Sequence, residues 1–314
     1  MKHLKLFESL NIERACQDLG LEDFQIVDGL VNVDGDVIIS EIGLDNIPVK
    51  FGRVNGDFIC SRNYLTSLEG APRSVGGDFD CSHNELNSLE GAPNSVNGYF
   101  DCSNNRLTSL KGNPNQVGGD FYCDNNKLMS LGDAPSSIIG SFYCDANNLT
   151  SLEGSPRSVT GSFYCDNNKL TNLEGSPRSI GGDLYCSNNN LTSLEGSPRS
   201  IGGDFVCFDN KLTSLEGAPI SVGGSLDCCR NQIIDFKVPE FSLNEEKVFI
   251  CNNNPIYKIY RLFDTPKCID LINEYSAVQG NKIIWDRLVE VFHGLDREVP
   301  DPNNLKFEYF KFVF

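Results

Sequence analysis

A 21-residue repeat restricts the folds open to this chain more than any other feature of its sequence. One copy, from Gly76 to Val96, reads GGDFDCSHNELNSLEGAPNSV. The register is marked by cysteines that lie 21 residues apart: Cys60, Cys81, Cys102, Cys123, Cys144, Cys165, Cys186, Cys207 and Cys228. An asparagine follows each cysteine after three residues: Asn63, Asn84, Asn105, Asn126, Asn147, Asn168, Asn189, Asn210 and Asn231. A copy this short cannot bury its own apolar face, so the repeat predicts a solenoid of stacked coils.

The alternation of residues within one copy predicts the path of a coil. In the residues that lead up to the cysteine, small and apolar side chains alternate with polar ones. This pattern indicates a single β-strand whose inward face is made of Val75, Gly77, Phe79 and Cys81. The polar residues between them are expected to point outward: Asp78, Asp80 and Ser82. A Gly-Pro turn then closes the coil. About ten residues remain for the return path, too few for a helix, so it should be irregular or polyproline-like.

The repeat sets the predicted domain boundaries at residues 31–254, about eleven coils. Ile39 stands in the cysteine column of a degenerate first coil, and Cys251 belongs to a stretched last coil. Residues 1–30 are predicted to be a helical cap with an amphipathic helix from Phe7 to Leu19, because an end coil otherwise exposes its apolar interior and a strand edge.

Residues 255–314 are predicted to be a helical C-terminal cap with an aromatic tail. Thr265 and Pro266 form an N-cap and first-turn pair that opens one helix, and a second helix is expected from about Lys282 to His293. The tail KFEYFKFVF has no polar face. We expect it to be buried as a strand on the cap, the alternative being an exposed docking segment.

The run F-x-C-x-x-N-x-L-x-x-L resembles the leucine-rich repeat signature. The phrase C-x-x-N-x-L-T-S-L-E-G-x-P-x-S-V-G-G-D-F is similar, more narrowly, to short repeats of bacterial proteins and of proteins encoded by tailed bacteriophages. This resemblance implies a leucine-rich repeat solenoid with a parallel β-sheet on its concave face, an irregular or polyproline-like convex side and helical caps. It also implies a protein-binding scaffold, and it supplies no catalytic residues.

The charge of the chain restricts its partners. There are 43 acidic and 26 basic residues, a formal net charge of -17, which repels phosphate backbones and anionic lipid. We therefore expect neither direct nucleic-acid binding nor membrane binding. The N-terminal residues lack the apolar core of a signal peptide, and no apolar run approaches the ~18 residues of a membrane span. These features predict a cytoplasmic protein, in the host cytoplasm if the protein is phage-encoded.

Candidate residues for catalysis or for metal binding are absent from the repeat pattern. The three histidines are scattered, at His3, His83 and His293. The cysteine column is expected to face the interior as small hydrophobic residues, since Ile39 occupies the same column. We therefore predict no enzyme activity, no cofactor and no metal site.

Two outward columns vary along the repeat and are the predicted protein-binding residues. The residues before the cysteines include Tyr122, Tyr143, Tyr164, Tyr185 and Val206, and the residues after them include Asp124, Asp145, Asp166 and Phe208. Tyrosine is a common interface anchor, and flanking carboxylates favour a basic partner. The alternative is that recently duplicated copies share these residues by descent and that stacked tyrosines simply stabilise the sheet.

A further pair of columns lies at the turn. Glutamates recur at positions such as Glu174 and Glu195, with arginines such as Arg178 and Arg199 four residues on, and we expect a solvated, charge-paired turn face. Two other functions stay open besides the protein-binding scaffold. An acidic rod could mimic nucleic acid and inhibit a DNA- or RNA-binding protein, or the chain could be a structural component of a phage particle. We expect a monomer, with self-association as the sign of the structural role.

Overall fold

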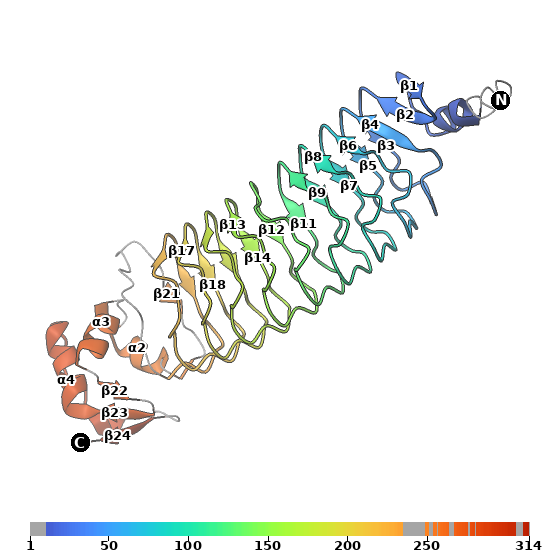
Figure 1. The fold of residues 1–314 in the computed structure, drawn as a ribbon. Helices are drawn as coiled ribbons and strands as arrows, with labels where there is room; N and C mark the ends of the chain where they lie inside the picture. The colour runs from blue at the N-terminus through green and yellow to red at the C-terminus, as the bar shows by residue number, and fades with distance from the viewer. Residues whose placement is uncertain are drawn as a thin grey trace. The chain divides into compact units, whose positions relative to one another are not determined.

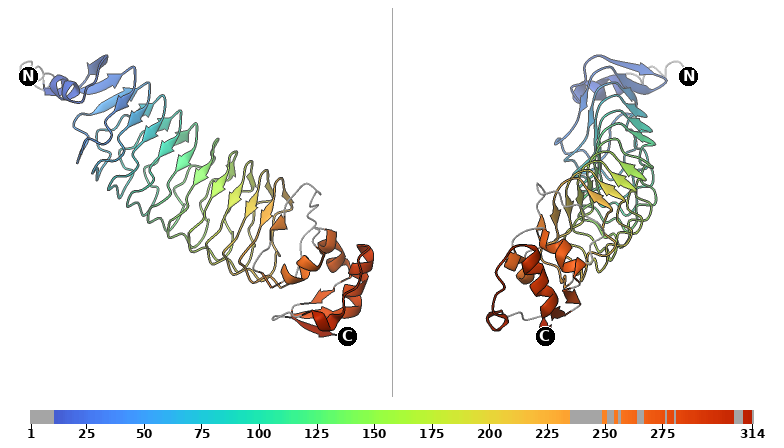
Figure 2. Two further views of the ribbon diagram at one scale, coloured as in Figure 1. Left: turned by 180° about the vertical axis from the view of Figure 1, so that it is seen from behind. Right: turned by 90° about the vertical axis from the view of Figure 1, so that its left-hand side faces the viewer.

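The computed structural model describes residues 11–234, 249–250, 254–255, 257–263, 267–275, 277–279, 281–305 and 310–313. The chain folds as two compact units, Met1–Asn168 and Lys169–Phe314. Figure 1 shows the order of their helices and strands. In each unit, successive copies of the repeat form successive coils whose short strands stack side by side (Figure 2). The predicted fold class, a leucine-rich repeat solenoid built on parallel strands, is confirmed.

The first unit begins with a helix over residues 11–18, within the range predicted for the N-terminal cap; the start of that predicted helix lies outside the described residues. An antiparallel hairpin follows, formed by β1 (Phe24–Val27) and β2 (Leu30–Val33). The sequence analysis did not predict this hairpin. Its turn is Asp28-Gly29, with φ of 52° and 78°, which is the geometry that Asp-Gly pairs favour between hairpin strands.

Each repeat contributes to two parallel sheets. In the first unit one sheet contains β4 (Phe51–Val54), β6 (Ser74–Val75), β8 (Ser95–Val96) and β10 (Gln116–Val117), and β2 pairs parallel with β4. The other contains β3 (Val37–Ile38), β5 (Phe58–Ile59), β7 (Phe79–Asp80), β9 (Phe100–Asp101), β11 (Phe121–Tyr122), β12 (Phe142–Tyr143) and β14 (Phe163–Tyr164). A further short strand, β13, spans Ser158–Val159.

The second unit repeats this arrangement. Its strands in one sheet are β15 (Ser179–Ile180), β17 (Ser200–Ile201) and β19 (Ser221–Val222), and those in the other are β16 (Leu184–Tyr185), β18 (Phe205–Val206), β20 (Leu226–Asp227) and β21 (Phe249–Ile250). The pairing is parallel and in register, as in Ser179↔Ser200 and Leu184↔Phe205. Residues 84–93 of a typical repeat form no helix or strand, as predicted for the return path.

The expected single strand through residues 75–81 is wrong, because a bend at Gly76-Gly77 divides it into β6 and β7. The bend brings the glycine backbone against the preceding coil. A Cβ atom on Gly77 would overlap the Asp57 carboxylate and the Gly56 backbone. The glycine column therefore exists because neighbouring coils approach each other too closely there for any side chain.

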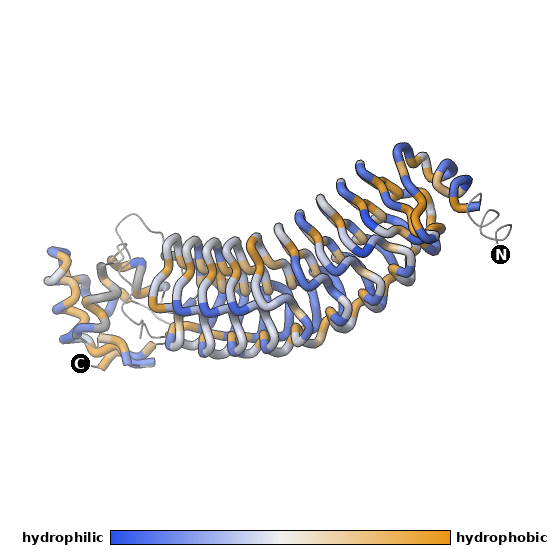
Figure 3. The backbone as a smooth tube through the Cα atoms, turned by 45° about the horizontal axis from the view of Figure 1, so that its top comes forward, coloured by the Kyte–Doolittle hydropathy of each residue, from blue (hydrophilic) through white to orange (hydrophobic). Residues whose placement is uncertain are grey.

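Apolar residues recur at the same positions of successive coils (Figure 3), and they form the core. Phe79, Cys81, Leu86 and Leu89 are each 0% exposed, and the same columns are buried in the neighbouring coils. Because the strands are in register, the phenylalanine rings stack, and the centroids of Phe79 and Phe100 lie 5.4 Å apart at 6°. Burial of these columns supplies the apolar area that a single repeat cannot bury alone.

The asparagine column ties each coil to its neighbour. Asn105 Nδ2 donates to the carbonyls of Cys81 (3.0 Å), Cys102 (3.2 Å) and Ser103 (3.1 Å), and Asn105 Oδ1 accepts the Leu86 N–H at 3.0 Å. The amide is 8% exposed. One side chain therefore satisfies backbone groups of its own coil and of the preceding coil, as the sequence predicted for this column.

A second polar ladder, at the bend, was not predicted. Asp57 Oδ1 accepts the Asp78 N–H at 2.8 Å, and Asp78 Oδ1 accepts the Tyr99 N–H at 2.9 Å. Asp120, Asp183 and Asp204 make the equivalent bond to the next coil. Asp78 was expected only to point outward into solvent. Its carboxylate instead satisfies a backbone donor that the bend leaves without a strand partner.

The C-terminal region of the second unit combines helices with a small sheet. Its elements are α2 (Tyr257–Phe263), α3 (Lys267–Glu274), β22 (Val278–Gln279), β23 (Lys282–Ile284), α4 (Trp285–Gly294), the 3-10 helix η1 (Pro302–Asn304) and β24 (Lys311–Val313). Helix α2 was not predicted, and Thr265 and Pro266 lie outside the described residues. That this region caps the solenoid stays a prediction.

Three predictions for this region can be compared with the structure. The helix expected to open at Thr265-Pro266 is present as α3, whose described part begins at Lys267. The helix expected from Lys282 begins at Trp285, because Lys282–Ile284 pairs with β22 and β24 as a strand, which suits its β-branched residues. The aromatic tail forms β24 in its described part, as expected. Phe310 is 7% exposed and Phe312 packs edge-on against Trp285 at 5.4 Å.

The asparagine ladder makes Asn105→Ala a severe substitution. It leaves buried carbonyls of Cys81, Cys102 and Ser103 and the Leu86 N–H without this partner. We expect a loss of about 2–4 kcal/mol in the free energy of unfolding, measured by urea denaturation. Arg106→Ala, at the exposed neighbouring position, is the control and should cost under about 1 kcal/mol. Equal losses in the two variants would contradict the structural role of the amide.

The glycine column offers a matched pair of variants. Gly98→Ala would place a Cβ atom against the Asp78 carboxylate and the Gly77 backbone. Gly35 belongs to the same column in the first coil, and no atom lies within 4 Å of the position that its Cβ would take. We expect Gly98→Ala to cost about 1–3 kcal/mol and Gly35→Ala to stay within about 0.5 kcal/mol of the parent. Thermal and urea denaturation check both, and a neutral Gly98→Ala would show that coil contact does not require glycine.

Candidate protein-binding face

The tyrosine column of the first unit is a stack of aromatic rings on the outward side of β11, β12 and β14. The Tyr122 and Tyr143 rings lie 4.4 Å apart at 13°, and the Tyr143 and Tyr164 rings lie 4.4 Å apart at 6°. In-register pairing of the strands produces this stack, because it places the same side chain of each coil directly over the next. All three tyrosines are half-buried.

Tyr99 extends this group, although the sequence analysis did not select it. Its ring meets that of Tyr122 edge-on, with centroids 6.0 Å apart at 89°. The signal in the sequence is that Tyr99 replaces the aspartate or serine of its column. Burial, together with the carboxylates of Asp80 and Asp78, raises the pKa of Tyr99 to about 12, so its hydroxyl stays neutral.

The tyrosine hydroxyl at one end of the stack is also held in place. Tyr122 Oη donates to Asp120 Oδ2 at 3.0 Å. Burial and this hydrogen bond raise the pKa of Tyr122 above its ordinary value. Tyr99 and Tyr122 therefore present neutral phenols with polar tips on an apolar body, a combination that suits an interface.

The aspartate column lies beside the tyrosines. Asp124, Asp145 and Asp166 follow the buried cysteines and are half-buried. Burial and the neighbouring carboxylate of Asp124, then that of Asp166, raise the pKa of Asp145 to about 6. Asp124 accepts a hydrogen bond from Asn125 Nδ2 at 2.8 Å. The column concentrates negative charge at the edge of the aromatic stack.

Beyond the tyrosines, the same outward column contains carboxylates and then isoleucines. Asp101 Oδ1 accepts the Ser103 N–H at 2.8 Å, and burial raises the pKa of Asp101 to about 6. At the start of the array, Ile38 is 64% exposed and lies beside Ile59 in the paired strands β3 and β5. The outward face of the first unit thus changes along its length from aliphatic to acidic to aromatic.

The remaining predicted residues belong to the second unit. Tyr185 on β16 pairs in register with Val206 on β18, and both are half-buried. Phe208 is half-buried two residues further along the chain, and its carbonyl accepts the Asn188 N–H at 3.1 Å. The second unit therefore places one tyrosine and one valine side by side on its outward strand face.

The thiols of the cysteine column are buried in the described coils. Cys102 is 0% exposed, its thiol donates to the Tyr122 carbonyl at 3.2 Å, and burial raises its pKa well above the ordinary value. Cys81, Cys123 and Cys144 have the same environment. Within the described ranges, no group of three or more His, Cys, Asp or Glu side chains could hold a metal ion.

The charge-paired turn face expected from the glutamate and arginine columns is wrong for the described residues. Glu69 pairs instead with Lys50 of the preceding coil at 3.0 Å, and Glu90 pairs with Lys111 of the next coil at 3.5 Å. The column arginines Arg73, Arg157, Arg178 and Arg199 form no ion pair with any carboxylate in the part of the chain that the structure describes. The four-residue spacing spans a Gly-Pro turn rather than a helical turn, so it does not bring the two charges together.

Solved structures similar to this chain include two of YopM. YopM from Yersinia enterocolitica WA-314 aligns over 78% of this chain and 72% of its own, with 15% sequence identity and a TM-score of 0.38. YopM from Yersinia pestis, described as a leucine-rich effector protein, aligns over 69% of this chain and 88% of its own, with 15% identity and a TM-score of 0.25. No protein-family model matches the sequence, and no curated protein matches it significantly.

None of the helices in the described ranges has both the length and the apolar character needed to cross a bilayer.

The aspartate column predicts how stability depends on pH. The pKa of Asp145 is about 6 in the folded chain, above its ordinary value near 4, so folding takes up a proton between these values. Stability contributed by this group therefore falls as pH rises from about 4 to about 6. We expect Asp145→Asn to raise the urea midpoint at pH 7 and to leave it unchanged at pH 4.

Glu153→Gln is the control, because Glu153 is an exposed turn residue in the following part of the same coil. It should not change the urea midpoint at either pH. An Asp145→Asn variant that is less stable than the parent at pH 7 would contradict the predicted repulsion within the column.

Proposed function

We propose that this protein is a non-enzymatic scaffold that binds a protein partner through the outward strand face of its coils. The observation that carries the proposal is the stack of Tyr122, Tyr143 and Tyr164 beside the carboxylates of Asp124, Asp145 and Asp166. In the second unit, Tyr185, Val206 and Phe208 are the proposed contact residues. Repeat solenoids commonly use their strand faces for binding, and the YopM likeness adds no argument about the partner.

The geometry of the stack indicates what a partner would meet. Both faces of the Tyr143 ring are covered by its neighbours at 4.4 Å, so its ring edge and hydroxyl are the parts left for a partner. Ring edges carry partial positive charge and favour contact with carbonyl oxygens and aliphatic groups. The adjacent carboxylates favour lysine or arginine and would steer a basic partner toward this face.

We further propose a cytoplasmic location and a monomeric state, in the host cytoplasm if the short-repeat resemblance reflects a phage origin. The alternative function is an acidic mimic of nucleic acid, favoured by the aligned carboxylates and the net charge of -17. That function predicts binding that depends on charge along the whole chain and weakens steeply with salt. A structural role in a phage particle predicts self-association instead.

The proposed face can be tested by substitution of the stack. We expect the double variant Tyr143→Ser/Tyr164→Ser to weaken capture of a specific partner from host lysate by at least about tenfold, because it removes central rings of the proposed contact surface. Affinity capture at low and high salt, with quantitative mass spectrometry, measures the effect. A circular dichroism melt of each variant separates lost binding from lost folding.

Tyr64→Ser is the matched control, because Tyr64 is 61% exposed in the same unit but lies outside the stack. It should retain the partner. Retention of the partner by the stack variant, together with loss in high salt, would favour the acidic mimic. Recovery of the protein with itself alone would favour the structural role.

A further inference from the structure

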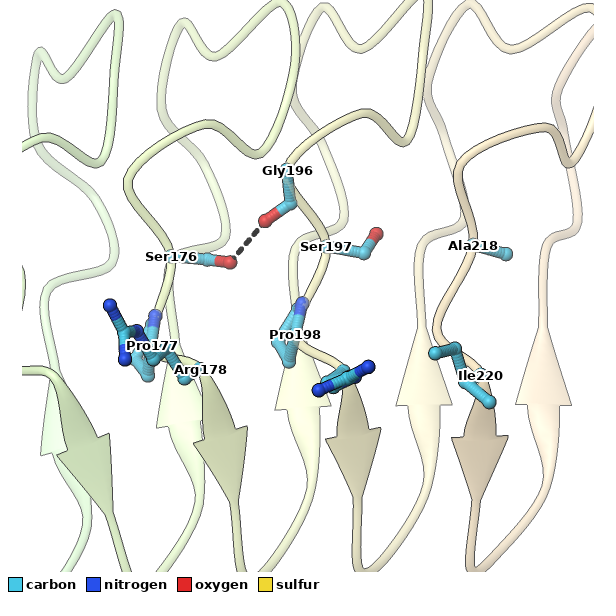
Figure 4. A pocket seen from close by; sticks show the side chains of 9 residues that line it. Ser176, Pro177, Arg178, Gly196, Ser197, Pro198, Ala218 and Ile220 are labelled. Atoms are coloured by element: carbon cyan, nitrogen blue, oxygen red, sulfur yellow. Dashed lines mark hydrogen bonds between the residues drawn. The ribbon is translucent and has the colours of Figure 1, made fainter.

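A pocket of about 340 Å³ in the second unit lies where three successive turns meet (Figure 4). The walls come from the same three positions of each repeat: Ser176-Pro177-Arg178, Ser197-Pro198-Arg199, and Ala218 with Ile220. The pocket lies on the turn side of the coils. Its residues are not among those proposed to bind a partner on the strand face. A volume near 300 Å³ suits one side chain or a small ligand.

Two arginines of neighbouring coils border this pocket. The Arg199 N–H donates to the Arg178 carbonyl at 2.9 Å, and the strands that follow pair as Ser179↔Ser200. Neighbouring parallel strands lie about 4.8 Å apart, so two cationic side chains leave the backbone one strand spacing from each other. Like charges placed opposite each other in this way repel and cost stability.

Neither arginine is neutralised by a residue that the structure describes. Both side chains are exposed, and neither forms an ion pair or a side-chain hydrogen bond with a described residue. The nearest hydroxyls are already used as donors, because Ser176 Oγ donates to the Gly196 carbonyl and Ser197 Oγ donates to the Leu194 carbonyl. In a chain with a net charge of -17, these two cationic side chains therefore lack a described ion-pair partner.

The rest of the pocket is apolar. Pro177, Pro198 and Ala218 are buried and form its base, whereas Ile220, which is 62% exposed, takes the place of a third arginine at one end. A ligand that fills the pocket would therefore present an anion to the guanidinium groups and apolar atoms to the prolines and Ile220.

We propose that this pocket binds a phosphorylated side chain of a partner protein. A phosphate monoester carries a charge of about −1.5 to −2 at neutral pH and three acceptor oxygens, so one group can bond both guanidinium forks and relieve their repulsion. A carboxylate carries a single charge and can neutralise only one of them. The apolar base accommodates the aliphatic or aromatic stem that carries the phosphate.

The test uses the full chain and a fluorescein-labelled pentapeptide with a central phosphotyrosine. We expect saturable binding by fluorescence anisotropy, no binding of the unphosphorylated peptide, and displacement by inorganic phosphate only at much higher concentration. Arg178→Gln/Arg199→Gln should weaken binding by about tenfold or more, because it removes both charged forks but keeps polar side chains of similar length.

Arg73→Gln is the matched control, because Arg73 is an exposed arginine of the same column that forms no ion pair with a described residue, and its successor in the next coil is Asn94. It should bind the phosphopeptide as the parent does. Equal binding of both peptides, or undiminished binding by the double variant, would overturn the proposal. Displacement by inorganic phosphate at the same concentration as the peptide would also overturn it, since the site would then recognise a free anion.

Discussion

The hydrogen bonds of the asparagine side chains are the interaction on which the rest of the structure depends. From β5 to β21 the described strands of the coils are two residues long, so the strand ladders end before the chain turns. At that point Asn84, Asn105 and their equivalents supply an amide that bonds the backbone of two coils at once. Buried carbonyls with no such partner would each cost free energy, so the coils cannot separate without exposing several of them together.

The bend at Gly76-Gly77 depends on a different set of hydrogen bonds, which the aspartate side chains make. The carboxylates of Asp57 and Asp78 each accept one backbone N–H of the next coil. The glycines leave room for those carboxylates. Tyr99 interrupts the ladder, since its side chain cannot accept the equivalent bond, and its ring packs against Tyr122 instead. One substitution thus exchanges a backbone-supporting group for an aromatic surface group, at the point where the tyrosine stack begins.

The spacing of Cys81, Asn84 and Leu86 was enough to predict stacked coils, the buried columns and the structural role of the asparagine. Each of these predictions depends on the regular spacing of a residue type, which can be seen directly in the sequence. The bend, the Asp78 ladder and the hairpin turn at Asp28-Gly29 depend on backbone dihedral angles and close approach, which a two-residue alternation does not reveal. The aromatic contact of Tyr99 with Tyr122 was not predicted, because these two residues stand in different columns of the repeat. A comparison of equivalent positions within one column does not reveal such a contact.

In-register stacking places identical side chains over each other, and the physical consequence differs from column to column. For Tyr143 and Tyr164 it gives favourable ring contacts at 4.4 Å. For Asp124 and Asp145 it brings carboxylates together, and it places Arg178 beside Arg199 with no described anion between them. Stacking in the first column also stabilises the free protein. The two charged columns oppose the stability of the free protein, so oppositely charged groups from a ligand would be bound most favourably there.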